Sequence, residues 1–166
     1  MRRCESCGLG VVGAAHGSAD ALAALDQLDR DDAIRIVNRA SFAAWFGSAG
    51  WAGLEPESHY LFTPEAVRRL LANRDQVVTS ARWMPGAGIA SIWQTLLNGL
   101  TFGHNVALGA FGRATAVPAR RPWQRRLDAL ISVLAAIPAL LVAVPLELVA
   151  AIFRRGAAIS LRFKLL

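Results

Sequence analysis

The residues near the N-terminus best suited to chemistry are two cysteines and a histidine. Cys4 and Cys7 are the only cysteines of the chain, and two residues separate them, which is the spacing of half a zinc site. His16 is the nearest further ligand, whereas a structural zinc ion takes four. Three interpretations stay open: a complete site within one chain, a zinc ion shared by two chains, and a knuckle without metal. A secreted disulfide framework is excluded, because it needs more cysteines.

A second set of side chains with chemical potential lies in the aromatic segment between residues 51 and 60. Histidine is the usual side chain for acid–base work near neutral pH. His59 stands beside Tyr60, with Trp51 a few residues before it. The three residues are candidates for contact with a substrate, and the alternative for His59 is a hydrogen-bonded structural histidine. We identify no catalytic residue in the chain.

The glycine pair Gly86 and Gly88 lies between a predicted strand and a helical pattern, where phosphate-binding loops occur. A dinucleotide site also needs an acidic residue about 20 positions later, for the ribose hydroxyls. The next acidic residue is Asp128, which is too far away. A turn between strand and helix is therefore the better interpretation.

Charge divides the chain into two unlike halves. Residues 1–75 hold 8 basic and 10 acidic residues, whereas residues 76–166 hold 10 basic and 2 acidic residues. Hydrophobic residues make up 54% of the chain, and no charge occurs from Trp83 to Gly112, so this stretch is expected to be buried or at a membrane. A basic and apolar half suits an anionic surface. Because the arginines flank apolar runs, we expect phospholipid and not nucleic acid.

One long apolar segment, at about residues 127–153, has arginines at both ends. Ala129–Leu146 contains no charge, which is close to the length that spans a bilayer. Pro138 and Pro145 interrupt it and Glu147 follows, so we expect a helical hairpin that enters one leaflet and returns. The candidate membrane-interface residues are Trp123, Arg120, Arg121, Arg125, Arg126, Arg154 and Arg155.

The remaining pattern predicts short helices and strands. Leucines at helical spacing predict a short helix within residues 20–32. Thr63 before Pro64 and Glu65 is typical of a helix start. Three strands are predicted by β-branched or alternating residues, at Ala33–Val37, Gln76–Ala81 and Ala157–Leu165.

Three stretches follow one another in an informative order: Ile34–Ser41, Trp51–Leu71 and Arg155–Leu161, with Cys4–Leu9 ahead of them. Together they resemble bacterial class I S-adenosylmethionine (SAM) methyltransferases. The stretches are similar to the fifth strand with its PN-x-x-S turn, the W-x-x-L-x-x-P-x-H-x-x-x-F-T/S-P-E-x-L-x-x-L-L segment and the closing strand of that family. Cys4–Leu9 is similar to the C-x-x-C-G-L knuckle that some members carry ahead of the catalytic domain. Val37 stands where the family has proline.

The resemblance implies the C-terminal half of that fold. In the family's strand order 3-2-1-4-5-7-6, strands 5, 7 and 6 would be present as neighbours. Only 26 residues separate Cys7 from Ile34, too few for the SAM-binding strands, since a βαβ unit needs about 30. We therefore expect an incomplete α/β fold resembling α+β, with a three-stranded sheet and an apolar helical hairpin. Residues 1–20 would form the knuckle and a flexible segment, and residues 21–166 the methyltransferase-like domain.

The expected function is that of a truncated, non-catalytic methyltransferase-like protein, which binds no cofactor by itself. It would lie in the cytoplasm on the inner face of the membrane, and would bind an apolar substrate or a partner enzyme. One alternative is a methyltransferase subunit that needs a partner chain for its SAM site, and another is a small integral membrane protein. Without a fourth strand, Ala33–Val37 would be an open sheet edge, to be covered by the N-terminal segment, a second copy or a partner enzyme.

Overall fold

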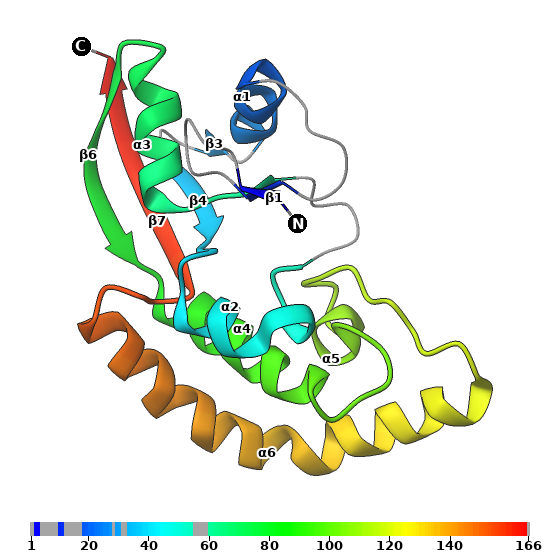
Figure 1. Cartoon of the computed structure of the whole chain (residues 1–166). Helices are drawn as coiled ribbons and strands as arrows, with labels where there is room; N and C mark the ends of the chain where they lie inside the picture. Colours follow the sequence, from blue (N-terminus) through cyan, green and yellow to red (C-terminus); the bar gives the residue numbers. More distant parts are fainter. Residues whose placement is uncertain are drawn as a thin grey trace.

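The computed structural model describes residues 2–3, 10–11, 18–27, 29–30, 33–54 and 60–165. Among these residues the main sheet has four strands, one more than expected, and its three longest strands lie far apart in the sequence (Figure 1). They are β4 (Ala33–Val37), β7 (Ala158–Leu165) and β6 (Gln76–Trp83). Strand β7 lies between the other two and pairs antiparallel with both. The structure therefore confirms all three predicted strands, and β6 extends two residues beyond the prediction.

The edge of the sheet at β4 is partly covered by the chain itself. Strand β3 (Asp29–Arg30) pairs antiparallel with the first two residues of β4, Ala33 and Ile34. Two smaller strands, β1 (Arg2–Arg3) and β2 (Gly10–Val11), form a separate antiparallel sheet with β5 (Tyr60–Leu61). Antiparallel sheets and helices together give an α+β architecture.

One face of the main sheet is covered by helices α1 (Ser18–Asp26) and α3 (Pro64–Ala72). Helix α3 begins as predicted: Pro64 is in its first turn and the Thr63 side chain accepts a hydrogen bond from the Ala66 N–H. Its apolar residues occur at helical spacing, so they share one face and bury it against Ile34, Ile36 and Leu161 of the sheet. These contacts form one hydrophobic core.

The turn after β4 is held by a buried asparagine. The Asn38 side chain donates to the Gly156 carbonyl at 3.0 Å and accepts from the Ala40 N–H, while its backbone N–H bonds to Ala157. Ser41 then caps helix α2 (Phe42–Gly47) by accepting from the Ala44 N–H. The N-x-x-S pattern thus joins the end of β4 to the start of β7.

A helical layer lies below the sheet in Figure 1. It consists of α2, the short 3-10 helix η1 (Ser48–Gly50), α4 (Pro85–Asn98), α5 (Val106–Ala110) and α6 (Pro122–Ile152). The uncharged stretch from Trp83 to Gly112 supplies α4 and α5, and Ile92 and Leu97 of α4 are fully buried. The two glycines of the possible phosphate loop lie in the first turns of α4.

The predicted helical hairpin is wrong, because α6 is one continuous helix of 31 residues. Pro138 and Pro145 are both inside it and both exposed. A proline removes one backbone hydrogen bond and bends a helix away from its own side. Figure 1 accordingly shows α6 bowed around the domain. The helix ends at Ile152, where Arg154 adopts a left-handed conformation (φ 56°) and the chain turns back into β7.

Candidate functional site

The C-terminal half of α6 turns its carboxylate toward the domain. Glu147 is 0% exposed. Its Oε1 accepts a hydrogen bond from Trp83 Nε1 at 2.6 Å and from the Ala157 N–H at 2.9 Å. Burial raises the pKa of Glu147, and the hydrogen bonds from Trp83 and Ala157 act in the opposite direction.

Two glycines make room for this carboxylate. A Cβ atom on Gly88 would come within van der Waals overlap of Glu147 Oε1, and one on Gly156 would lie 2.8 Å from the Trp83 ring. Glycine at these positions therefore permits the close approach of α4 and the chain before β7 to α6.

The N-terminal half and the middle of α6 are fixed in the same way. Asp128 is 1% exposed, and its two oxygens accept hydrogen bonds from the backbone N–H groups of Phe102 and Gly103 at 2.8 and 2.9 Å. Between the two carboxylates, Trp93 Nε1 donates to the Ala136 carbonyl at 2.8 Å. Asp128, the Ala136 carbonyl and Glu147 thus face the domain at three points along α6.

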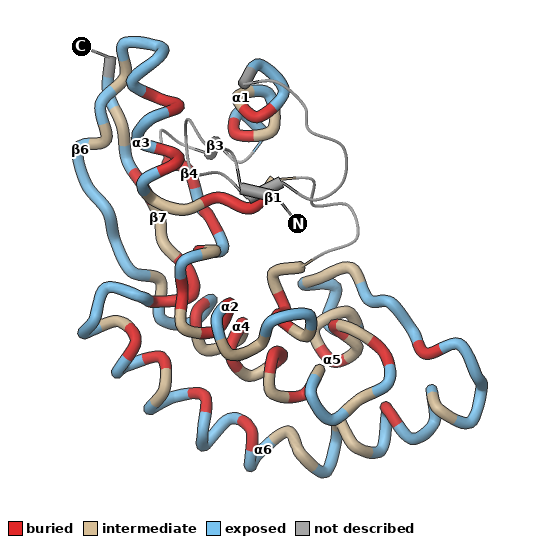
Figure 2. Tube along the Cα trace, viewed as in Figure 1, coloured by how far each residue is buried: buried red, intermediate tan, exposed pale blue. Residues whose placement is uncertain are grey.

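The opposite face of α6 is apolar and faces outward. Val133 is 73% exposed and Ile137 is 70% exposed, although neither is near an end of the helix. Figure 2 shows the outer side of α6 as largely exposed. We call this the outer face of α6, and its exposed apolar residues are Leu127, Leu130, Val133, Leu134, Ile137, Leu140, Leu141, Val142, Val144, Leu148, Val149 and Ile152.

Arginines border both ends of this face. All six predicted interface arginines are exposed: Arg120, Arg121, Arg125, Arg126, Arg154 and Arg155. Trp123 is 50% exposed and makes an edge contact with the ring of Phe102, which is also exposed. The predicted interface residues therefore all lie at the two ends of one apolar helix.

No protein-family model, curated protein or solved structure matches this chain. Among the described residues, one helix is long and apolar enough to cross a membrane, and it is α6. Only 11% of its most apolar window is buried, which distinguishes it from the core helix of a globular domain. Its length and composition are by themselves weak evidence of a membrane protein.

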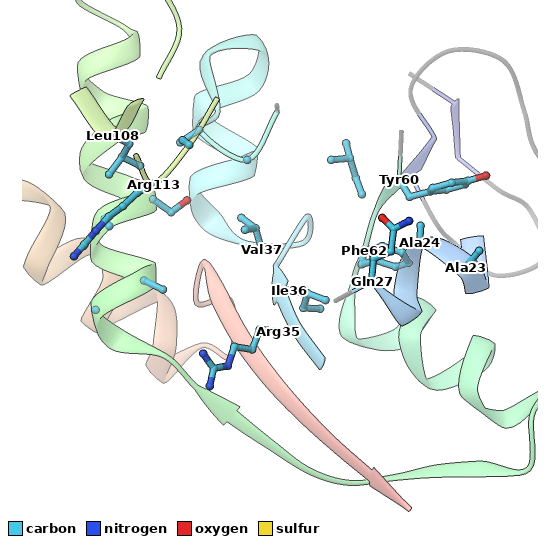
Figure 3. A pocket seen from close by; sticks show the side chains of 18 of the residues that line it. Ala23, Ala24, Gln27, Arg35, Ile36, Val37, Tyr60, Phe62, Leu108 and Arg113 are labelled. Carbon is cyan, nitrogen blue, oxygen red and sulfur yellow. The ribbon is translucent and has the colours of Figure 1, made fainter. Parts of the chain in front are cut away.

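A hollow of about 800 Å³ lies beside the free part of the β4 edge. In Figure 3, Tyr60 and Phe62 lie on one side of it, Leu108 and Arg113 on the other, and Arg35–Val37 between them. Within the described part of the chain, the Tyr60 hydroxyl has no hydrogen-bond partner. Burial and the charge of Asp20 raise its pKa. Of the predicted substrate contacts, Tyr60 therefore lines a hollow.

The other predicted substrate and metal residues have different positions. Trp51 is 1% exposed and packs in the core with Ala43, Ile92 and Ala143, so it is not available to a ligand from solution. The described residues contain no group of three or more potential metal ligands. Four predicted residues lie outside the described part of the chain: His59, Cys4, Cys7 and His16.

Sequence reasoning missed the roles of Asp128 and Glu147. Both interrupt apolar or basic sequence, and Glu147 was used as an argument against a straight membrane-spanning helix. Their separation of 19 residues is no signal by itself, because at 3.6 residues per turn it places them about 100° apart around a helix. Their inward direction depends on hydrogen-bond donors that they meet only in the folded chain.

Proposed function

We propose that this protein is a peripheral membrane protein that lies on the anionic inner face of the cytoplasmic membrane through the outer face of α6. The observation that carries the proposal is the inverted polarity of α6, which buries Asp128 and Glu147 and exposes its leucines and isoleucines. Burying one such side chain is worth about 1.5–3 kcal/mol, so an exposed row of them favours an apolar environment. A row of exposed apolar side chains that runs along a whole helix is typical of interaction sites.

The charges around the outer face of α6 indicate what it contacts. Arginines flank the apolar row at both ends, and the carboxylates of α6 are turned away from it. A second copy packed along α6, parallel or antiparallel, would bring these arginines together, which is unfavourable. A membrane that contains anionic lipids meets them with opposite charge, at about 1 kcal/mol per basic residue. An anionic bilayer is therefore the better complement.

The curvature of α6 fits a helix that lies on the membrane. Because the bow is concave toward the domain, the middle of the outer face protrudes and the arginine-rich ends recede (Figure 1). The apolar middle would enter the acyl boundary while the ends stay among the headgroups. A transmembrane orientation would require loss of the hydrogen bonds made by Asp128, Ala136 and Glu147, or the entry of their partners into hydrocarbon.

Vesicle flotation tests the proposal. The wild-type protein is expected to float with vesicles of phosphatidylglycerol and phosphatidylcholine, and less with phosphatidylcholine alone. The double variant Leu134→Glu/Leu141→Glu should lose at least tenfold in membrane affinity, because two carboxylates would enter the acyl boundary. Ala72→Glu is the matched control, since Ala72 is exposed at the end of α3, far from α6 in Figure 1.

Equal binding by the double variant and the wild type would refute this use of α6. Carbonate extraction separates the proposal from the integral alternative, because a peripheral protein is released at alkaline pH. Resistance to carbonate, with the two ends of α6 labelled from opposite sides, would establish a transmembrane helix instead.

The methyltransferase-like part of the proposal is supported by strand order. Strands β4, β7 and β6 are neighbours in the order 5-7-6 that the resemblance implies. The stretch between Cys7 and Ile34 is too short for the SAM-binding strands, so the protein is proposed to be non-catalytic and to bind no SAM alone. Titration calorimetry with SAM tests this, and a one-to-one curve in the micromolar range would contradict it.

The second candidate function is the binding of a partner subunit at the β4 edge. The register of β4 on β7 favours Arg35–Val37 as the place of contact. Asn38 bonds to Ala157, so by alternation the N–H groups of Ile34 and Ile36 face β7 and those of Arg35 and Val37 face the hollow. No described strand pairs with Arg35–Val37 on that side. A second copy or a partner methyltransferase would pair there, bringing an apolar substrate to the hollow.

Proline substitution at this edge tests the pairing. Val37→Pro should remove one intermolecular hydrogen bond while leaving the β4–β7 bonds, and light scattering at several concentrations should show a weaker self-association. Ile36→Pro is the contrasting variant, because it breaks the sheet itself. A wild-type chain that is monomeric at all concentrations would exclude the second copy.

A further inference from the structure

The face of the main sheet opposite α1 and α3 carries basic side chains and is open to solvent. Antiparallel partners point their side chains to the same side of a sheet. Arg35 pairs with Ser160, and Ser160 pairs with Arg82, so the three form one row across β4, β7 and β6. Arg162 lies two residues along β7 from Ser160 and therefore on the same face.

These three arginines surround one position. Adjacent strands are about 4.8 Å apart, so the Cα atoms of Arg35 and Arg82 are about 10 Å apart, with Ser160 between them. Together with Ala33, Trp83 and Met84, the four residues line a hollow of about 370 Å³. Three guanidinium side chains and one hydroxyl group thus line one hollow, which is large enough to admit an anion.

Among the residues that the structure describes, no acidic side chain pairs with these arginines. Within the described part of the chain, none of the three makes a salt bridge, and the acidic partners recorded on the surface, Asp26 and Glu65, bind arginines of α3 and the turn after it. Three guanidinium groups on neighbouring strands repel one another, because like charges at this separation are only partly screened. An anion above Ser160 would relieve that repulsion.

We infer that the open face of the main sheet is a binding site for a phosphoryl group, held by Arg35, Arg82 and Arg162 with Ser160 as a further hydrogen-bond donor. Arginine presents a planar fork that binds phosphate oxygens in pairs, which distinguishes it from a point charge. The site does not depend on α6 or on the proposed membrane orientation. Its ligand is a phosphate monoester or diester, on a lipid headgroup or in a soluble molecule.

A nucleic acid is a poorer match for this face. Nucleic-acid affinity comes from many phosphate contacts along a strand and from exposed aromatic rings that stack on bases. Here the basic face spans only three strands, and the indole N–H of its one lining tryptophan, Trp83, is bonded to Glu147. The face is suited to one or two phosphoryl groups.

Binding of defined phosphates by the purified full chain tests this inference. Inorganic phosphate and a short-chain, micelle-free phosphatidic acid are titrated and followed by phosphorus NMR line broadening. Arg82→Gln and Arg35→Gln should each weaken binding about tenfold, the loss of one charge-assisted hydrogen-bonding group. Arg82→Lys should restore only part of the affinity, because the fork is lost. Arg68→Gln is the control, since Arg68 is also exposed and lies on α3, which covers the opposite face.

The two probes distinguish a lipid headgroup from a soluble phosphoryl compound. Similar affinities for both probes would identify a soluble phosphoryl ligand, whereas tight binding of phosphatidic acid alone, lost in Arg82→Gln, would identify a lipid headgroup. Absence of saturable binding by either probe, or equal losses in Arg68→Gln and Arg82→Gln, would overturn the site. Stronger binding of a short single-stranded oligonucleotide, lost in the same variants, would overturn the phosphoryl ligand in favour of nucleic acid.

Discussion

Helices α3 and α6 are both amphipathic, and they are oriented oppositely with respect to the protein. Helix α3 buries Val67, Leu70 and Leu71, and exposes Glu65 in ion pairs with two arginines of its own. Helix α6 buries Asp128 and Glu147 and exposes its aliphatic side chains. The apolar face of α3 stabilises the domain, whereas most of the apolar surface of α6 contributes nothing to it. Such surface is explained by contact with something outside the domain.

Truncation of one leucine in each helix is expected to have the most unequal effects on stability. Leu70→Ala should lower the free energy of unfolding by about 2–5 kcal/mol, because it leaves a cavity between α3 and the sheet. Leu141→Ala should change it by less than about 0.5 kcal/mol in detergent-free buffer, because Leu141 is exposed. Urea unfolding followed by far-UV circular dichroism measures both. Similar losses would show that the outer face of α6 is covered within the folded protein.

The inward polar contacts of α6 predict the next largest effect. Glu147→Ala should cost about 2 kcal/mol, because the Trp83 and Ala157 donors lose their buried acceptor. Glu147→Gln should cost much less, since the two shortest bonds converge on one oxygen, which the amide retains. Glu65→Ala is the exposed control, expected to cost less than about 1 kcal/mol. If Glu147→Ala left the free energy of unfolding unchanged, the carboxylate would be in water and the assigned orientation of α6 would be wrong.

Two glycines of α4 differ in how closely they approach α6. Gly88→Ala should destabilise the fold by about 1 kcal/mol or more, because its Cβ would collide with Glu147. Gly86→Ala should stabilise it by about 0.5 kcal/mol, because no atom lies within 4 Å of that position and alanine favours a helix. Differential scanning calorimetry measures the difference in melting temperature. Stabilisation by both substitutions would mean that α4 and α6 are not in close contact.

The smallest effect concerns pH. Burial raises the pKa of Glu147 above its ordinary value of 4.5, so between these two values the folded chain binds more protons than the unfolded chain. The contribution of Glu147 to stability is therefore fully present below pH 4.5 and is lost as the pH rises through the raised pKa. Glu147→Gln should not lose stability in this way, because an amide does not titrate. The difference in the free energy of unfolding between the wild type and Glu147→Gln, measured across pH 4–8, gives the size of the effect. Parallel pH profiles would contradict the shift.

The local elements were predictable because short-range signals determine them. Thr63, Pro64 and Glu65 define a helix start by capping and by the geometry of proline, and β-branched residues define Ala33–Val37. The α6 prediction failed because Pro138 and Pro145 were taken as breaks. A proline removes one backbone hydrogen bond from a helix and bends it. The packing of α6 against α4 offsets this loss of stability.

The sequence alone determined the composition of the surfaces: an apolar segment bordered by arginines, a basic C-terminal half and three strands. Tertiary structure decided which way those residues face. The direction of Asp128 and Glu147 depends on donors from residues 102, 103, 83 and 157, and the row formed by Arg35, Ser160 and Arg82 depends on strand register. Both are long-range pairings, and no local propensity encodes them, because the partners meet only when the chain has folded.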